Sequence, residues 1–308
     1  EDDLLTVQGR TIRLQNTAIR HHLAQGTHHP GRSLESFNLP QASSPGHLPS
    51  EPDKAASLPL SRTLPAAINK AGRLRMLSQR MAKCWLMIAR RVAPIRARKM
   101  LQDSIRAFDT LLSEIEALEI APEARACLAT ILELWPDYRA LLDTPPGADN
   151  TRTARAFFQL SEKLLIATNA LTLALEQTLN TPENHLINLA GRERMLSQRM
   201  AKFFMFLDWQ PTGINRAKCR EELHRSMREF ENALTMLTRE IRNQPEIQHQ
   251  LVAVADQWRQ MRSVLDMTDK RADNQEIHRQ TGAVCSFSER LLKKMDTAVA
   301  LYEKKLTA

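Results

Sequence analysis

Apolar residues recur at helical spacing through most of the chain after residue 65. In one such stretch they are Ile105, Phe108, Leu111, Leu112, Ile115 and Leu118. Prolines such as Pro94 and Pro122 separate the stretches, because proline lacks the amide proton that a helix interior needs. The pattern predicts helices over residues 65–91, 95–119, 122–142, 151–179, 182–208, 214–242, 245–267 and 271–305.

The N-terminal part has a different pattern. Residues 1–20 contain enough apolar positions for a short helix, and residues 21–64 are rich in Pro, His, Ser and Gly. Such a composition buries too little apolar surface to offset the entropy of ordering the chain. Residues 1–64 are therefore predicted to be a disordered linker segment. The histidine pairs at 21–22 and 28–29 could bind a metal ion, although solvated linker histidines are the simpler interpretation.

One sixteen-residue phrase occurs twice. Residues 68–83 read INKAGRLRMLSQRMAK and residues 187–202 read INLAGRERMLSQRMAK, so fourteen of sixteen positions are identical. Weaker echoes follow each copy: Trp135 matches Trp258, and Ser-Glu at 161–162 matches Ser-Glu at 288–289. A repeated phrase indicates a repeated structural unit. We therefore predict two four-helix units, residues 65–180 and 181–308.

The short connections between the predicted helices favour antiparallel neighbours. The predicted fold class is all-α: two tandem antiparallel four-helix bundles packed as a pseudo-twofold pair, preceded by the disordered N-terminal segment. Such a pair is a covalent version of a symmetric homodimer. The two repeated helices would then lie side by side and parallel.

A stripe of mostly small residues runs along one face of the repeated helix. It consists of Ile68, Ala71, Arg75, Ser78 and Ala82 in the first copy and Ile187, Ala190, Arg194, Ser197 and Ala201 in the second. Arg75 and Arg194 would face each other across the pseudo-twofold axis. Two guanidinium groups about 6 Å apart repel by roughly 3 kcal/mol at an effective dielectric near 20. A small anion between them would replace that repulsion with charge-assisted hydrogen bonds.

Other residues of the repeated phrase could complete such an anion site. Gly72 and Gly191 lie beside the stripe and allow close backbone approach, and Ser78 and Ser197 could line the site. The remaining basic residues of the phrase are interpreted as solvated or paired with glutamates. Together these residues predict a ligand site between the two repeated helices.

Composition limits the class of function. The formal net charge of +8 suits an anionic partner, but nucleic acid is disfavoured because basic and acidic residues alternate along most helices. The four cysteines have neither CxxC nor zinc spacing, and no nucleophile–base set or phosphate loop is visible. We expect no enzyme activity, no metal and no cofactor. No apolar stretch is long enough to predict a transmembrane segment.

The repeated phrase resembles the signature of PilJ-type sensor domains, the extracytoplasmic input modules of some chemotaxis transducers. It is also similar to the nitrate-binding P-box of NarX-like nitrate/nitrite sensor kinases. The resemblance covers about residues 65–306 and implies that Arg75 and Arg194 bind nitrate at the axis, with Gly72 and Gly191 close to the ligand. Arg73 stands where those kinases have serine, as does its counterpart in the second copy, which makes the site more basic.

The resemblance leads to one expected function and one alternative. The chain is expected to be a non-enzymatic sensor that recognises a small oxyanion, nitrate or nitrite, and signals through a membrane transducer or a sensor kinase. The resemblance implies a periplasmic location, with a cytoplasmic one as the alternative. The alternative function is a helical scaffold or interaction module of a chemotaxis or two-component system without a ligand of its own.

Overall fold

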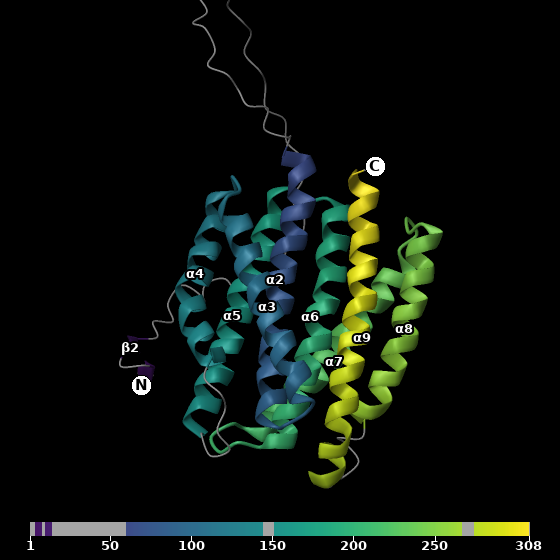
Figure 1. The fold of residues 1–308 in the computed structure, drawn as a ribbon. Helices are drawn as coiled ribbons and strands as arrows, with labels where there is room; N and C mark the ends of the chain where they lie inside the picture. The colour runs from purple at the N-terminus through teal and green to yellow at the C-terminus, as the bar shows by residue number, and fades with distance from the viewer. Residues whose placement is uncertain (1–3, 8–9, 14–59, 144–150, 267–273, 308) are drawn as a thin grey trace, which may run out of the picture. The chain divides into compact units, whose positions relative to one another are not determined.

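The computed structural model describes residues 4–7, 10–13, 60–143, 151–266 and 274–307 (Figure 1). In the N-terminal unit, β1 (Leu4–Val7) pairs antiparallel with β2 (Arg10–Arg13). The short helix predicted within residues 1–20 is therefore wrong at these positions. Half of the paired residues are Thr, Val or Ile, whose branched side chains favour extended backbone. The rest of the predicted linker up to residue 59, with its histidine pairs, lies outside the described residues.

The second unit, Leu58–Ala308, contains the predicted helices. They are α2 (Leu60–Ala89), α3 (Pro94–Glu116), α4 (Pro122–Asp143), α5 (Thr151–Thr178), α6 (Pro182–Trp209), α7 (Arg216–Arg239), α8 (Pro245–Leu265) and α9 (Asn274–Thr307). The first helix begins at Leu60 rather than at Pro65, and Pro136 lies inside α4. The all-α prediction is confirmed for this unit.

Local sequence explains where several helices begin. The Thr181 hydroxyl accepts a hydrogen bond from the Asn184 amide at 3.2 Å, and Pro182 occupies the first helical position of α6. The Asn215 side chain caps α7 in the same way, accepting from the Lys218 amide at 3.1 Å. These caps satisfy amide groups that have no partner inside the helix.

The helices form two groups, which we call the first half (α2 to α5) and the second half (α6 to α9). In the first half α2 packs against α3 and α5, and in the second half α6 packs against α7 and α9. The most extensive contact joins α2 to α6, so the two repeated helices form the interface, with α4 and α8 at the outer edges in Figure 1.

The two repeated helices run in the same direction. On α2, Arg75 bonds to Asn188 of α6 and Lys83 bonds to Gln198, so residue numbers rise together along both helices. Arg194 of α6 bonds in turn to Asn69 of α2, which is the equivalent of the Arg75–Asn188 contact with the two halves exchanged. These exchanged contacts confirm the predicted pseudo-twofold packing.

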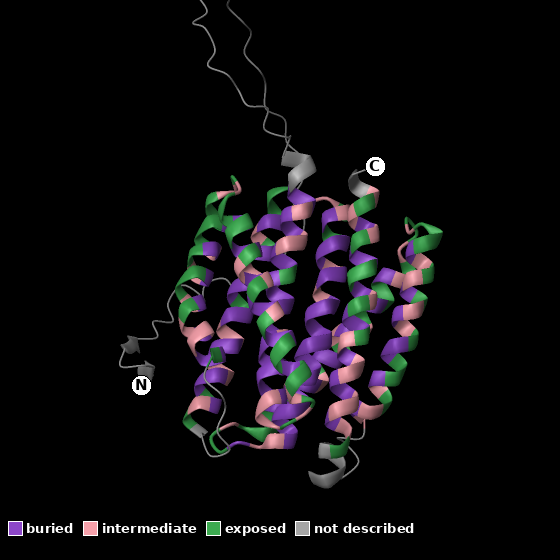
Figure 2. Ribbon diagram, viewed as in Figure 1, coloured by how far each residue is buried: buried purple, intermediate pink, exposed green. Residues whose placement is uncertain are grey.

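The second repeated helix is covered on all sides. Every residue from Glu193 to Asp208 is buried, and Figure 2 shows α6 almost wholly in the colour of buried residues. A helix covered all round lies at the centre of its assembly. Aromatic packing also joins the halves: the ring centroids of Phe158 and Phe206 lie 5.2 Å apart, edge to face. Among the described residues, no helix combines the length and apolar character needed to cross a membrane.

Candidate functional site

Arg75 and Arg194, which we call the arginine pair, lie at the interface of α2 and α6 and are 1% and 2% exposed. Both guanidinium groups converge over the two glycines of the repeated phrase. A Cβ atom at Gly72 would lie 3.4 Å from Arg194 Nη2 and 4.0 Å from Arg75 Nη2, and one at Gly191 would lie 3.3 and 3.7 Å from the same atoms. A Cβ at Gly72 would therefore make an ordinary contact, whereas a Cβ at Gly191 would require the Arg194 guanidinium to move by a few tenths of an ångström.

The Arg75 guanidinium hydrogen-bonds only to neutral groups in the described structure. Its Nη1 donates to Asn169 Oδ1 at 2.8 Å, and its Nη2 donates to Asn188 Oδ1 at 3.0 Å and to the Asn188 carbonyl at 3.2 Å. Its Nε is buried without a hydrogen-bond partner. Burial, with the nearby charges of Arg192 and Arg194, lowers the pKa of Arg75 to about 9. Arg75 is therefore a buried cation with no carboxylate in direct contact.

The second arginine has a similar arrangement with one acidic partner. Arg194 Nη1 donates to Asp296 Oδ1 at 3.1 Å, and its Nη2 donates to Asn69 Oδ1 at 2.9 Å. The Asn69 amide in turn donates to Glu303 at 2.7 Å. Burial lowers the pKa of Arg194, against the opposing effect of Asp296. Its Nε is also buried without a hydrogen-bond partner.

The two predicted serines are used within their own helices. The Ser78 hydroxyl donates to the Arg75 carbonyl at 2.8 Å, and the Ser197 hydroxyl donates to the Arg194 carbonyl at 2.7 Å. Both accept a hydrogen bond from the side-chain amide of the following glutamine. The structure thus brings together four of the six predicted site residues, the arginines and the glycines, while the serines support the helix backbone beneath the arginines.

A second set of charges crosses the interface, and we call it the crossed ion pairs. Arg80 and Lys83 of α2 contact Glu289 of α9, at 2.6 and 2.5 Å. The exchanged counterparts are the contacts of Arg199 and Lys202 of α6 with Glu162 of α5. Both lysine side chains are fully buried. Each half therefore neutralises basic residues of the other.

These contacts hold the two glutamates in the ionised form. Burial alone would raise their pKa values, but Lys83 and Arg80 lower the pKa of Glu289 to about 2. Lys202 and Arg199 lower the pKa of Glu162 to about 2 in the same way. Burial lowers the pKa of Lys202 to about 8, so both ends of that pair are charged at neutral pH.

The sequence interpretation missed the acceptors of these contacts, although repeated signals marked them. The asparagines at 69 and 188 are identical in both copies of the phrase, and the glutamates at 162 and 289 belong to the repeated Ser-Glu echo. The interpretation of the other basic residues as glutamate-paired holds for six of them: Lys70, Arg80, Lys83, Arg192, Arg199 and Lys202. It did not foresee that Glu162 and Glu289 reach basic residues of the opposite half.

Among the described residues of the second half, one buried carboxyl group has no hydrogen-bond partner. Glu193 is fully buried, and neither of its carboxylate oxygens has a hydrogen-bond partner. Burial raises the pKa of Glu193 well above its usual value. Leu74 occupies the equivalent place in the first copy. The described residues contain no group of three His, Cys, Asp or Glu side chains that could hold a metal ion.

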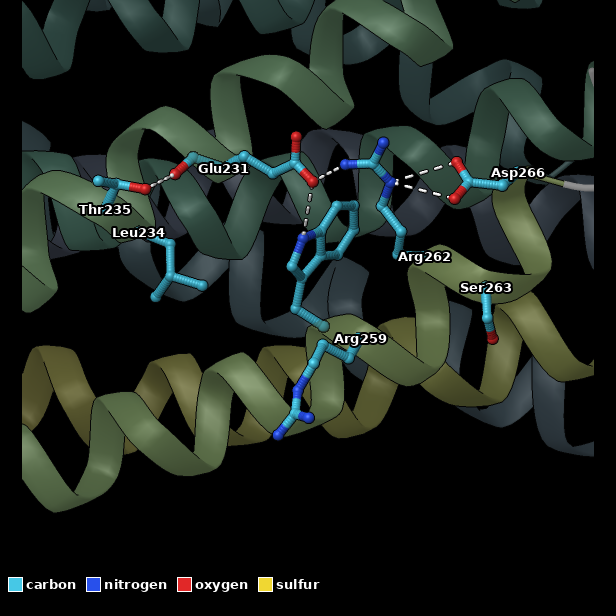
Figure 3. Close-up of a pocket in the computed structure, with 8 residues that line it drawn as sticks. Glu231, Leu234, Thr235, Arg259, Arg262, Ser263 and Asp266 are labelled. Atoms are coloured by element: carbon cyan, nitrogen blue, oxygen red, sulfur yellow. Dashed lines mark hydrogen bonds and ion pairs between the residues drawn. The ribbon is translucent and has the colours of Figure 1, made fainter.

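A pocket of about 550 Å³ lies on α7 and α8 and shares no lining residue with the arginine pair (Figure 3). Three of its charged groups contact one another: Arg262 lies between Glu231 and Asp266, and the Trp258 indole donates to Glu231 at 3.3 Å. The first half repeats this cluster with Trp135, Asp109, Arg139 and Asp143. The repetition indicates a structural tie between the second and third helices of each half.

The fold and the site define an all-α protein whose buried charges gather where two parallel helices, one from each half, meet. A scan against known families matches residues 61–157 and 178–300 to the PilJ family, described as the type IV pili methyl-accepting chemotaxis transducer N-terminal domain. The chain belongs to this family, a family of sensory transducer domains in chemotaxis signalling. No curated protein and no solved structure is significantly similar to the chain.

Proposed function

We propose that this chain is a sensor module that binds a small oxyanion, nitrate or nitrite, at the arginine pair. Each four-helix half would be one copy of the family's domain, related to the nitrate-binding P-box. The bound anion would be reported by a partner, a membrane transducer or a sensor kinase. A periplasmic location would suit this role.

The observation that carries the proposal is the buried charge of Arg75, which has no direct carboxylate partner among the described residues; Glu176 acts on it only from beyond Asn188. A buried cation is costly unless a counter-charge lies close to it. Arg75 contacts two neutral amides, and its Nε and that of Arg194 are buried donors without partners. An oxyanion supplies both the negative charge and planar acceptors that suit guanidinium groups.

Isothermal titration calorimetry with nitrate, nitrite and chloride tests the proposal. Replacing Arg75 or Arg194 by glutamine should weaken oxyanion binding by about 10- to 100-fold, because a charge-assisted hydrogen bond is lost. Arg106, which is exposed on α3, provides the matched control Arg106→Gln, which should leave the affinity unchanged. Oxyanion affinity that survives both site substitutions would contradict the proposed site.

One observation favours the alternative of a scaffold without a ligand. The arginine pair is almost completely buried and already donates to side chains of α2, α5, α6 and α9. In a scaffold, Arg75→Gln would lower the free energy of unfolding without any ligand present. In a sensor, it would lower ligand affinity while removing a buried charge that has no direct carboxylate partner. Urea denaturation with and without nitrate separates the two functions.

A further inference from the structure

The two halves of the arginine site match in shape but differ in charge. Arg75 Nη1 donates to Asn169 of α5, and Arg194 Nη1 donates to Asp296 of α9. These two acceptors occupy equivalent places, since both follow the repeated Ser-Glu by the same number of residues. The pseudo-twofold symmetry is therefore broken by one charge, with almost no change of side-chain shape.

The other partners of the arginine pair are balanced between the halves. Asn188 accepts from Arg75 Nη2, and Asn69 accepts from Arg194 Nη2. The Asn188 amide in turn donates to Glu176 of α5, and the Asn69 amide donates to Glu303 of α9. At longer range Glu176 raises the pKa of Arg75 and Glu303 raises that of Arg194, while Arg192 and Arg73 have the opposite effect on the same two groups. The direct contacts of the pair thus include one carboxylate for two guanidinium groups.

We infer that Asn169 and Asp296 set the charge and position of the ligand: the site takes one monovalent oxyanion, held mainly by Arg75. This inference rests on the proposed function. Asp296 already neutralises Arg194, so one negative charge completes the pair. A divalent anion would bring a second charge near the Asp296 carboxylate. Asp296 is half-exposed, so solvent screens this repulsion in part, but the two like charges would share the same arginine. Asn169 and Asp296 are specificity-determining residues.

The test exchanges these two side chains, which differ by one charge and have nearly equal volume. The full chain and the variants Asp296→Asn, Asn169→Asp and the double exchange are titrated with nitrate and with sulfate. For each anion separately, the affinity of every variant is compared with that of the original chain, because planar nitrate and tetrahedral sulfate differ in shape. The exposed ion pair of α3 supplies the control Asp103→Asn, which should leave both affinities unchanged.

Each variant has an expected result. Asp296→Asn should strengthen sulfate binding by about threefold to tenfold, and Asn169→Asp should weaken nitrate binding by about threefold to tenfold. The double exchange should restore nitrate binding. In the original chain Arg75→Gln should cost more nitrate affinity than Arg194→Gln, and in the double exchange this order should reverse. Asp296 is 48% exposed in its side chain, so its replacement leaves the fold intact.

The outcomes distinguish this inference from the proposed function. If the original chain binds nitrate but the variants keep its nitrate and sulfate affinities, the inference is overturned and the proposed function stands. If Arg75→Gln and Arg194→Gln cost equal affinity, the inference is likewise overturned. If the original chain binds no oxyanion, both the proposed function and this inference are overturned.

Discussion

Replacing Glu289 by glutamine tests how strongly the crossed ion pairs hold the two halves together. The substitution keeps the size of the side chain and removes its charge. Lys83, which is fully buried, would retain the neutral acceptors Gln198 Oε1 at 2.7 Å and Ser288 Oγ at 3.2 Å. Arg80 would lose both of its bonds to the carboxylate. The variant thus leaves two basic groups at the interface without their counter-charge.

The magnitude follows from the shifted ionisation of Glu289. Its pKa falls from 4.5 to about 2, and each pKa unit corresponds to about 1.4 kcal/mol, which gives roughly 3 kcal/mol at neutral pH. The Glu289 side chain is 15% exposed, so solvent screens it only in part. Removing one partner of a buried pair typically costs about 3–5 kcal/mol. We expect Glu289→Gln to lower the free energy of unfolding by about 3 kcal/mol.

Equilibrium unfolding in urea, followed across pH, measures this effect. A carboxyl group whose pKa is lowered in the folded state stabilises the fold above its unfolded pKa near 4.5, and this contribution is lost as the pH falls through about 2. The difference between the original chain and Glu289→Gln should therefore be full at neutral pH and shrink below pH 4.5. The mirrored variant Glu162→Gln should show the same pH dependence with a smaller loss, because the pKa of Glu162 also falls to about 2 but Arg199 keeps Glu222 at 2.8 Å.

A surface pair provides the matched control. Asp103 and Arg106 form an ion pair with side chains 44% and 71% exposed, and Asp103→Asn should change the free energy of unfolding by about 0–1 kcal/mol. If Glu289→Gln costs no more than Asp103→Asn, the crossed ion pairs do not hold the halves together. A loss for Glu289→Gln that is independent of pH would refute the electrostatic explanation.

Three smaller predictions concern single side chains. Glu193→Leu should raise the free energy of unfolding at neutral pH by about 1–3 kcal/mol, with no gain below pH 4. The raised pKa of Glu193 favours the folded state only at low pH, and this contribution is lost as the pH rises. Gly191→Ala should weaken nitrate binding about threefold to tenfold without lowering stability, because the added Cβ would lie 3.3 Å from Arg194 Nη2 and shift that guanidinium, while alanine favours the helix. Gly72→Ala is the control and should change the affinity less, because its Cβ would make an ordinary contact with Arg194. Trp135→Phe should cost about 1 kcal/mol in urea unfolding, because the indole loses its bond to Asp109 at 2.8 Å.

The helices and the arginine pair could be predicted from the sequence because their signals are periodic and local. Apolar spacing marks the eight helices, and a repeat of fourteen identical positions implies two equivalent helices. Equivalent helices pack about an axis, so residues on the same stripe meet there. This reasoning places Arg75 and Arg194 opposite each other without any knowledge of the remaining contacts.

The crossed ion pairs could not be predicted in the same way. Arg80 and Glu289 are separated by 209 positions, and spacing alone does not tell which half supplies a glutamate to a given arginine. The N-terminal hairpin was missed for another reason. Short apolar stretches fit a helix or a strand equally well, and cross-strand pairing decided the outcome at Leu4–Val7 and Arg10–Arg13.

The duplication within one chain permits a site that a symmetric homodimer cannot form. In a homodimer, the residues equivalent to Asn169 and Asp296 would be identical, so the two arginines would have either no direct carboxylate or two. Two carboxylates would neutralise both arginines and leave no positive charge for an anion. Without any carboxylate, both arginines would keep a positive charge that the ligand would have to balance. A tandem chain can have one of each, which leaves Arg75 without a direct carboxylate partner. The crossed ion pairs then keep the unequal halves in register, since each half supplies the glutamate that the other requires.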